Sequence, residues 1–434
     1  MSEIAKKSVV TFATRVILQI VSIGGAIVIA RTLGASGKGV YTYAITILAM
    51  LQMANAGQSA ALAWQYTKRG RAPATVRRLM FRVLLMFGVP IAVGLALAGF
   101  LIPGQGALIA VAAAVPFALL VQSATGFFLA DSDVRTVNIQ QALTNALPVL
   151  MYVPLLYLLH GQLWVLFAVW TACYIIAAGY TLTQLRRYNS TEGDDEGPLL
   201  KEQLKFGGLA SLNSTVAYLN FRIDVFLIMF VLGHSALGVY SIGVGIGEML
   251  WQLSRPIATA AFGRIARGTE NEAAETTATC MRHSFALVCL GAIAIFFVAP
   301  VLIPLVYGKT FAEAGTVTRV LLPGIIAYSV MPTLSNFFSQ QLGMPRLPVL
   351  FSGLSTLICA GVTLALLPHF GILGGAFATS VSYVIAFSAA AAYFIRRTRI
   401  KPQRLFTLSR SDLDPYRSLL AVFHRKLRAP ISGS

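Results

Sequence analysis

Charge is scarce in this sequence, and acidic charge is scarcer still. Only 12% of the 434 residues are Asp, Glu, Lys or Arg, whereas soluble domains contain about 25%. The 16 acidic residues are outnumbered by 34 Lys and Arg, which gives a formal net charge of +18. In addition, 56% of the residues are hydrophobic and the mean hydropathy is +0.73. This composition excludes a water-soluble globular protein and predicts a chain that is solvated mainly by lipid.

Cysteine and histidine are also few, and neither type forms a ligand pattern. The four cysteines fall inside apolar segments without CxxC spacing, so we interpret them as packing residues. The five histidines are isolated in the sequence. We therefore predict no metal site. Because the stretches between apolar runs are too short for a catalytic domain, we also predict that the chain is not an enzyme.

Long apolar runs are what the sequence does contain. They recur along the chain, and each reaches about 20 residues, enough to cross the roughly 30 Å hydrocarbon core of a bilayer as a helix. The predicted fold class is an all-α membrane protein with twelve transmembrane helices in two six-helix lobes. The predicted spans are 8–30, 39–66, 79–101, 107–130, 136–159, 163–187, 203–232, 238–262, 277–305, 316–341, 349–368 and 374–395.

The basic residues gather in alternate loops. Opposite loops hold little beyond Arg31, Lys38, Lys309 and Arg319. The positive-inside rule therefore predicts that both termini are cytoplasmic, in a bacterial inner membrane. Because the charge lies in loops and not on one soluble face, it does not indicate a nucleic-acid partner. The loops on the N-terminal side contain Lys68, Arg69, Arg71, Arg77, Arg78, Arg135, Arg186, Arg187, Lys201, Arg264, Arg267 and Arg346.

A polar linker with an acidic run divides the predicted helices into two halves. We predict an N-terminal six-helix lobe at 1–190, a cytoplasmic linker at 191–202 and a C-terminal six-helix lobe at 203–396. A basic cytoplasmic tail follows at 397–434. The tail has apolar residues at helical spacing, so it is either an amphipathic helix on the anionic inner leaflet or a disordered basic segment.

A short internal repeat relates the two halves. Residues 33–41 read LGASGKGVY and residues 232–240 read LGHSALGVY, with six of nine positions identical at an offset of 199 (232 minus 33). We interpret this as a duplication. Six helices per half then predict a pseudo-two-fold axis along the membrane normal, with the substrate path between the halves and alternating access. The simpler interpretation is that the glycines only permit a tight turn and close helix contact.

Four segments carry a resemblance to a known family. They are ARTLGASGKGVYTYA at 30–44, FRIDVFLIMFVLG at 221–233, LGVYSIGVGIGEMLWQ at 237–252 and GILGGAFATSVSY at 371–383. In their order and spacing they resemble the polysaccharide flippases of the multidrug/oligosaccharidyl-lipid/polysaccharide (MOP) exporter superfamily, and the resemblance covers essentially the whole chain. It implies a V-shaped bundle of two lobes.

The resemblance also implies a function and partners. The cargo would be an undecaprenyl-diphosphate-linked oligosaccharide, such as an O-antigen, capsule or exopolysaccharide unit. The chain would move it from the cytoplasmic to the outer leaflet for surface polysaccharide synthesis, with membrane lipids and polysaccharide polymerase machinery as further partners.

Polar residues at helical spacing predict a cationic cavity. Arg15 and Gln19 share one face of the first helix, and Tyr218 and Arg222 share one face of the seventh. Ionisable groups inside spans usually line a water-filled path, and a lipid diphosphate requires arginine donors to cross a low-dielectric region. We therefore predict a substrate site formed by Arg15, Gln19, Tyr218, Arg222 and Arg255. The alternatives are that Arg15 snorkels to the interface and that Arg222 forms a structural ion pair.

Two carboxyl groups inside the predicted spans, Asp224 and Glu248, are candidates for coupling transport to H⁺ or Na⁺. Asp224 lies two residues from Arg222, about 200° around the helix, so it does not directly neutralise that arginine. A pairing of Asp224 with Arg255 on the next helix is left open. No other cofactor is predicted.

Aromatic and amide side chains that could contact sugars are also present in the spans, although in membranes such residues more often form belts or packing. The candidates are Tyr41, Trp64, Tyr218, Tyr240, Trp251, Gln58, Asn145, Asn336 and Gln340.

Two rival transport functions fit the same class of fold. A multidrug exporter of the same superfamily would require acids and aromatics in its cavity, whereas this cavity is predicted to be basic. A lipid II flippase has similar cargo chemistry, but such proteins typically carry two further helices.

Overall fold

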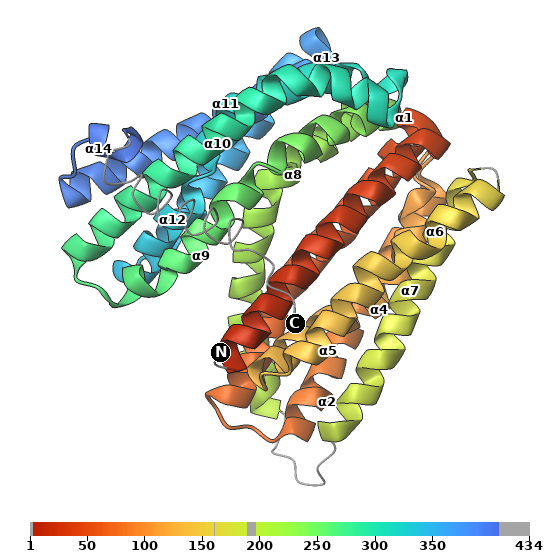
Figure 1. Ribbon diagram of the computed structural model, residues 1–434. Helices are drawn as coiled ribbons and strands as arrows, with labels where there is room; N and C mark the ends of the chain where they lie inside the picture. Colours follow the sequence, from red (N-terminus) through yellow and green to blue (C-terminus); the bar gives the residue numbers. More distant parts are fainter. Residues whose placement is uncertain (1–2, 160, 189–196, 408–434) are drawn as a thin grey trace, which may run out of the picture. The chain divides into compact units, whose positions relative to one another are not determined.

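The structure is a computed structural model that describes residues 3–159, 161–188 and 197–407, and all regular structure in these ranges is helical (Figure 1). The chain separates into two compact units. Unit 1 comprises Met1–Ile242, Leu302–Ala314 and Leu364–Ile372, and unit 2 comprises Gly243–Val301, Gly315–Thr363 and Leu373–Ser434. The predicted linker and basic tail fall largely outside the described residues, and the predicted lobe boundaries stay a prediction.

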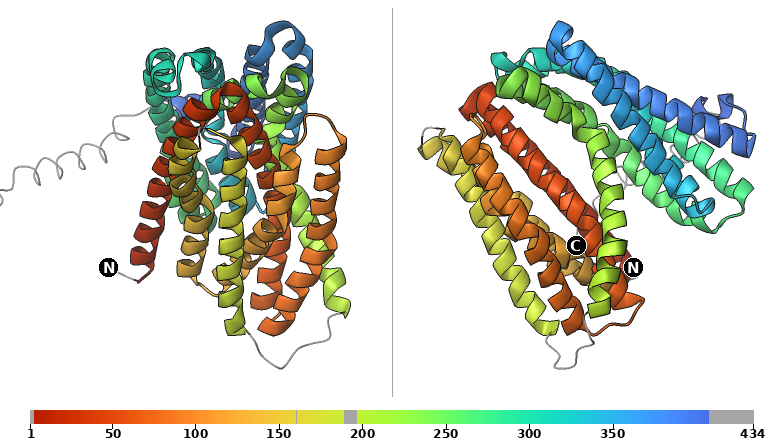
Figure 2. Two further views of the ribbon diagram at one scale, coloured as in Figure 1. Left: turned by 90° about the vertical axis from the view of Figure 1, so that its right-hand side faces the viewer. Right: turned by 180° about the vertical axis from the view of Figure 1, so that it is seen from behind.

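The helices of unit 1 are α1 (Glu3–Thr67), α2 (Pro73–Val83), η1 (Leu84–Gly88), α3 (Val89–Leu101), α4 (Ala107–Ala130), α5 (Val134–Gln141), η2 (Ala142–Ala146), α6 (Leu147–Leu158), α7 (Leu163–Leu185), η3 (Arg186–Tyr188), most of α8 (Gly197–Glu248) and η4 (Lys309–Phe311). Within this unit α4 contacts α1, α3 and α7, and Figure 2 shows these helices running alongside one another. Because α4 packs on several sides, it carries much of the buried core, including Phe128 and Ala118 at 0% exposure.

The helices of unit 2 are α9 (Trp251–Arg267), most of α10 (Glu270–Tyr307), most of α11 (Glu313–Tyr328), α12 (Met331–Asn336), η5 (Phe337–Gln341), most of α13 (Arg346–Thr398) and α14 (Gln403–Phe406). Three aromatic side chains, Trp251, Tyr328 and Tyr383, form a buried cluster with ring centroids 4.5–6.0 Å apart. This cluster joins α9, α11 and α13.

Nine helical stretches in the described residues are long and apolar enough to cross a membrane. Three of them, in α1, α8 and α13, each contain one non-helical glycine: Gly34, Gly233 and Gly371. Each glycine lies in the gap between two predicted spans. The predicted count of twelve spans stays a prediction.

The two copies of the repeat adopt the same backbone geometry. Gly34 has φ 66° and ψ −169°, and Gly233 has φ 83° and ψ −174°. Residues other than glycine rarely adopt this region, because the Cβ clashes with the backbone. The repeated glycine therefore sets the same sharp bend at the same position of each copy.

The two copies also contact each other through equivalent positions. A Cβ on Gly39 would overlap with the carbonyl oxygen of His234, and a Cβ on Gly238 would overlap with that of Ala35. These pairs are equivalent at the offset of 199 (39 and 238, 35 and 234). The Thr42 hydroxyl donates to the Ser241 hydroxyl at 3.2 Å, again between equivalent positions. A local two-fold relation therefore holds between residues 35–42 and 234–241.

Arginines on the predicted outer side bind backbone carbonyls of α10. In unit 1, Arg31 Nε donates to the carbonyl oxygen of Val306 at 2.7 Å, near the end of α10 where carbonyls have no helical partner. In unit 2, Arg319 Nε donates to the carbonyl oxygen of Phe296 at 2.8 Å. Pro300, four residues later, has no N–H to satisfy that carbonyl. Both arginines therefore have structural roles here.

Candidate substrate cavity

Unit 1 contains a cavity of about 460 Å³ between α1, η2, α6, α7 and the first arm of α8. Both arms of α1 contribute to its wall, on either side of the bend at Gly34. The residues that line it are Ser22, Ala26, Ile29, Lys38, Tyr41, Ile45, Thr46, Leu48, Ala49, Gln52, Thr144, Asn145, Pro148, Val149, Tyr152, Trp170, Tyr174, Tyr218 and Arg222.

The first cation of the cavity is Lys38. Because the bend at Gly34 takes only one residue, the helix resumes at once, and Lys38 lies one turn into the second arm of α1. Its side chain is 8% exposed. Lys38 Nζ donates to Thr42 Oγ1 at 3.0 Å and lies 5.8 Å from the centre of the Tyr41 ring. Burying an ammonium is costly, and these two contacts offset part of that cost.

The second cation is Arg222, which lies on the first arm of α8. Tyr218 lies one helical turn earlier, and both side chains line the cavity. Arg222 Nη1 donates to the carbonyl oxygen of Phe221 at 2.9 Å, and the Tyr218 hydroxyl donates to that of Thr46 at 3.3 Å. The structure therefore brings these two predicted site residues together.

Aromatic side chains form a large part of the wall. Trp170 and Tyr174, one turn apart on α7, meet edge to face with ring centroids 5.6 Å apart. Gln52 Nε2 donates to the Tyr174 hydroxyl at 3.4 Å. The Tyr152 hydroxyl fills the space that a side chain at Gly25 would need. This wall offers flat rings and hydroxyl groups, the surfaces that bind the faces and the hydroxyls of sugars.

A π-helical turn, η2, presents two polar residues to the cavity. It ends two residues before Pro148, whose missing N–H disturbs the preceding helical hydrogen bonds. Thr144 Oγ1 donates to the carbonyl oxygen of Gln140 and Asn145 Nδ2 to that of Gln141, both at the end of α5 and at 2.9 Å each, and both residues line the cavity.

The charge balance of the cavity is positive. Its lining contains one lysine and one arginine, and no aspartate or glutamate occurs among the described lining residues. A cavity of this kind attracts anions and repels cations, and its low-dielectric walls strengthen both effects.

Asp224 lies elsewhere in unit 1 and is 2% exposed. Its carboxylate accepts hydrogen bonds from the Tyr240 hydroxyl and from the backbone N–H of Val225, the latter at 2.8 Å. It is not a lining residue of the cavity, as its position about 200° from Arg222 predicts. Buried Asn220 lies one turn earlier on the same helix.

The remaining predicted site residues lie outside this cavity. Gln19 is exposed on α1 and is not among the lining residues. The backbone of Arg15 is helical, but its side chain lies outside the described residues. Arg255 is exposed and Glu248 is partly buried, and both belong to unit 2. Their predicted roles stay predictions.

The sequence pattern missed Lys38 as a cavity residue and assigned it to an outer loop, because three glycines surround it. The aromatic residues Tyr152, Trp170 and Tyr174 were also missed, because their spacing does not differ from ordinary packing. A comparison of the two repeat copies could have drawn attention to Lys38, because the other copy has the apolar residue Leu237 at this position. Of the sugar-contact candidates, Tyr41, Tyr218 and Asn145 do line the cavity.

Comparison with known proteins gives one family match and several structural relatives. Residues 102–316 match the family described as "Polysaccharide biosynthesis protein". No curated protein matches the sequence. The fold is similar to that of the lipid II flippase MurJ in an inward closed conformation, with TM-score 0.77 and 12% identity over 98% of this chain and 94% of that one.

The fold is also similar to an inward-facing multidrug resistance MATE family transporter of the MOP superfamily. The TM-score is 0.69 and the identity 15%, over 88% of this chain and 94% of that one. The family match and the similarity in fold to these two transporters agree with the resemblance that the sequence motifs indicate.

Proposed function

We infer that this chain is a flippase of the MOP superfamily, and we propose that its cargo is an undecaprenyl-diphosphate-linked oligosaccharide. The observation that carries the proposal is the cavity of unit 1, which combines Lys38 and Arg222 with an aromatic wall and no described acidic lining residue. The match of residues 102–316 to polysaccharide biosynthesis proteins supports surface polysaccharide synthesis as the process.

The cavity chemistry suits both parts of such a cargo. A diphosphate carries two or more negative charges, which guanidinium and ammonium donors bind through charge-assisted hydrogen bonds. The sugar would lie against Tyr41, Trp170 and Tyr174, with Asn145 as an amide partner. The cavity is smaller than a long oligosaccharide, so we expect it to hold the diphosphate and the first sugar.

Export of organic cations is the main rival function, because MATE transporters share the fold. A site for organic cations requires carboxylates, and the described lining contains two cations instead. The lipid II flippase is a closer rival, since its cargo carries the same kind of anionic linkage. The match to polysaccharide biosynthesis proteins favours a surface polysaccharide unit over lipid II.

The proposed mechanism is alternating access in a bacterial inner membrane, with both termini in the cytoplasm and two lobes related by the duplication. Asp224 and Glu248 are the proposed sites for a coupling H⁺ or Na⁺. Buried Asp224 is proposed because the two hydrogen bonds that its carboxylate accepts would hold it in place for a bound cation. Replacing Asp224 by Asn should remove the dependence of flipping on an ion gradient.

The test is flipping in proteoliposomes. The protein is reconstituted with a labelled polyprenyl-diphosphate oligosaccharide, and accessibility of the label in the outer leaflet is followed over time. Lys38→Gln, Arg222→Gln and Arg15→Gln are compared with wild type. Arg135→Gln is the matched control, because Arg135 is exposed at the predicted cytoplasmic end of α5.

We expect wild type and Arg135→Gln to flip the lipid, and Lys38→Gln and Arg222→Gln to lose at least tenfold in rate. Arg15→Gln should slow flipping if Arg15 lines the cavity. It should leave the flipping rate unchanged if Arg15 snorkels to the interface. If wild type leaves the lipid in place but transports a cationic dye, the multidrug function holds and the proposed arginine and lysine roles are wrong.

A further inference from the structure

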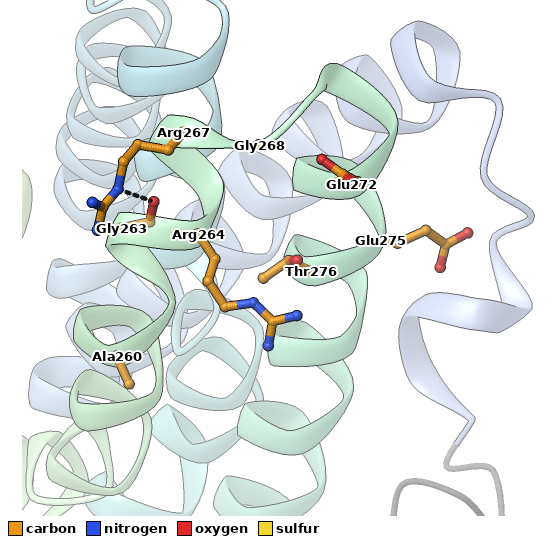
Figure 3. Close-up of a pocket in the computed structure, with 8 residues that line it drawn as sticks. All are labelled: Ala260, Gly263, Arg264, Arg267, Gly268, Glu272, Glu275 and Thr276. Carbon is orange, nitrogen blue, oxygen red and sulfur yellow. Dashed lines mark hydrogen bonds between the residues drawn. The ribbon is translucent and has the colours of Figure 1, made fainter.

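Unit 2 contains a separate groove of about 700 Å³ where α9 ends and α10 begins (Figure 3). It is lined by Ala260, Gly263, Arg264, Arg267, Gly268, Glu272, Glu275 and Thr276. We propose that this groove binds the phosphate headgroup of an anionic phospholipid. This inference is independent of the cargo and of the cavity in unit 1.

The two arginines supply the anion-binding groups. In Figure 3, Arg264 extends between the two helices on the side of Thr276, whereas Arg267 turns back over Gly263. Arg267 Nε donates to the carbonyl oxygen of Gly263 at 3.3 Å. Among the described residues, Arg264 has neither an ion pair nor a side-chain hydrogen bond, and both arginines are exposed. Two guanidinium groups one turn apart therefore face the groove without a carboxylate bound to them.

The two acidic residues of the groove are engaged elsewhere. Glu272 accepts the backbone N–H of Thr269 at 2.9 Å and caps the start of α10. Glu275 forms an ion pair with Arg404 at 3.0 Å, and in Figure 3 its carboxylate points away from Arg264. The local charge available to a ligand is therefore positive.

The shape of the groove suits a headgroup. Ala260, Gly263 and Gly268 have small or no side chains, which leaves the groove open beside the two arginines. The groove lies beside the first turns of α10, a helix long and apolar enough to cross a membrane, and phospholipid phosphates meet membrane helices at their ends.

Beyond His283, which lies on the same face and is partly exposed, this face of α10 continues as an apolar track. Leu287 and Leu290 lie 11 and 14 residues after Thr276 (287 and 290 minus 276), which is close to whole helical turns. Leu290 is 67% exposed and Leu287 is partly exposed. At 1.5 Å per residue, Leu287 is roughly 17 Å from Thr276, about the depth of one leaflet. Acyl chains could follow this track while the phosphate stays at the arginines, which favours a lipid over free phosphate.

The experiment measures lipid binding to the purified full-length protein. Native mass spectrometry counts retained phosphatidylglycerol, and titration of phosphatidylglycerol in detergent gives an apparent affinity from the rise in Tm. The same measurements are made with phosphatidylethanolamine and with inorganic phosphate. The variants are Arg264→Gln and the double variant with Arg267→Gln, and the matched control is Arg346→Gln, another exposed arginine of unit 2.

We expect the affinity for phosphatidylglycerol to fall about fivefold for each arginine removed, and roughly 25-fold in the double variant. The control should keep the wild-type affinity, and phosphatidylethanolamine should bind no more tightly to wild type than to the double variant. Equal loss in Arg346→Gln would overturn the proposal, because the effect would then reflect overall charge. An equal response to inorganic phosphate would also overturn it, because the groove would then be an anion site that does not select lipid.

Discussion

The two copies of the repeat share a backbone but differ in chemistry. Gly34 and Gly233 bend the chain in the same way, and Gly39 and Gly238 let the copies touch. The N-terminal copy then places Lys38 in the wall of a cavity, whereas the C-terminal copy has Leu237 at 0% exposure in its place. The repeated glycines therefore set the same backbone in both copies, whereas the cavity lysine occurs in one copy alone.

The repeated tyrosine shows the same contrast. Tyr41 lines the cavity, whereas Tyr240 is fully buried and donates its hydroxyl to Asp224. The N-terminal residue at the position of Asp224 is Gly25 (224 minus 199), and the Tyr152 hydroxyl fills the space beside it. The C-terminal half therefore has the buried carboxylate of Asp224 at a position where the N-terminal half has a glycine beside the cationic cavity.

The largest expected effect comes from breaking the contact that the copies share. Gly39→Val would place a side chain against the backbone carbonyl of His234, which cannot move aside as a flexible side chain could. We expect a loss of about 3 kcal/mol or failure to fold, at the upper end of overpacking costs. Thermal unfolding in detergent measures it. Gly245→Ala is the control, since a Cβ there meets nothing within 4 Å, and an equal loss in the control would refute the contact.

The second largest effect is expected when one copy receives a residue of the other. Lys38→Leu gives the N-terminal copy the residue of the C-terminal one. We expect the rate of lipid flipping to fall about 10- to 100-fold, the range for losing one charge-assisted hydrogen bond. Tm should stay the same or rise, because a buried charge is removed. Parallel loss of Tm and transport would instead assign Lys38 a structural role.

A smaller effect should separate the two tyrosines. Tyr240→Phe removes a hydrogen bond to a buried carboxylate, and we expect a loss of about 2 kcal/mol in stability. Tyr41→Phe should cost less than about 0.5 kcal/mol, because the described structure gives its hydroxyl no hydrogen bond. Chemical denaturation of both variants measures the difference. Equal losses would mean that the copies are not chemically distinct here.

The smallest expected effect concerns the hydroxyl pair between the copies. Ser241→Ala removes the acceptor of the 3.2 Å bond from Thr42, together with the bond that the Ser241 hydroxyl donates to the carbonyl oxygen of Gly238 at 2.9 Å. We expect a loss of about 1 kcal/mol, the usual contribution of a neutral hydrogen bond. The exposed Ser22→Ala is the comparison, and Tm reports both. A loss no greater than that of Ser22→Ala would show that the close glycine contact alone holds the copies together.

The sequence predicted the parts of this account that depend on hydropathy and repetition. The gaps between the predicted apolar spans contain Gly34, Gly233 and Gly371, where the structure has its bends. Glycine suits these positions because it adopts the backbone conformation of such a bend without a clash. Tyr218 and Arg222 were predicted for the cavity because helical spacing puts them on one face.

The rest depended on features that a linear pattern does not contain. Lys38 was assigned to a loop because glycines suggest a loop, whereas the bend at Gly34 is short enough for the helix to continue through it. The π-helical turn η2 follows from the local effect of Pro148 and from packing, so the positions of Thr144 and Asn145 could not be predicted. The aromatic wall of Trp170 and Tyr174 is recognisable only once α7 is placed beside α1.

The most direct test of the central claim is the binding preference of the cavity in unit 1. Equilibrium binding of a polyprenyl-diphosphate oligosaccharide and of an organic cation is measured on wild type, Lys38→Gln and Arg135→Gln. The account predicts that the diphosphate lipid binds, that Lys38→Gln weakens its binding at least tenfold, and that Arg135→Gln does not. The account would be contradicted if the cation bound more tightly than the lipid and if Lys38→Gln left the binding of the cation unchanged or strengthened it.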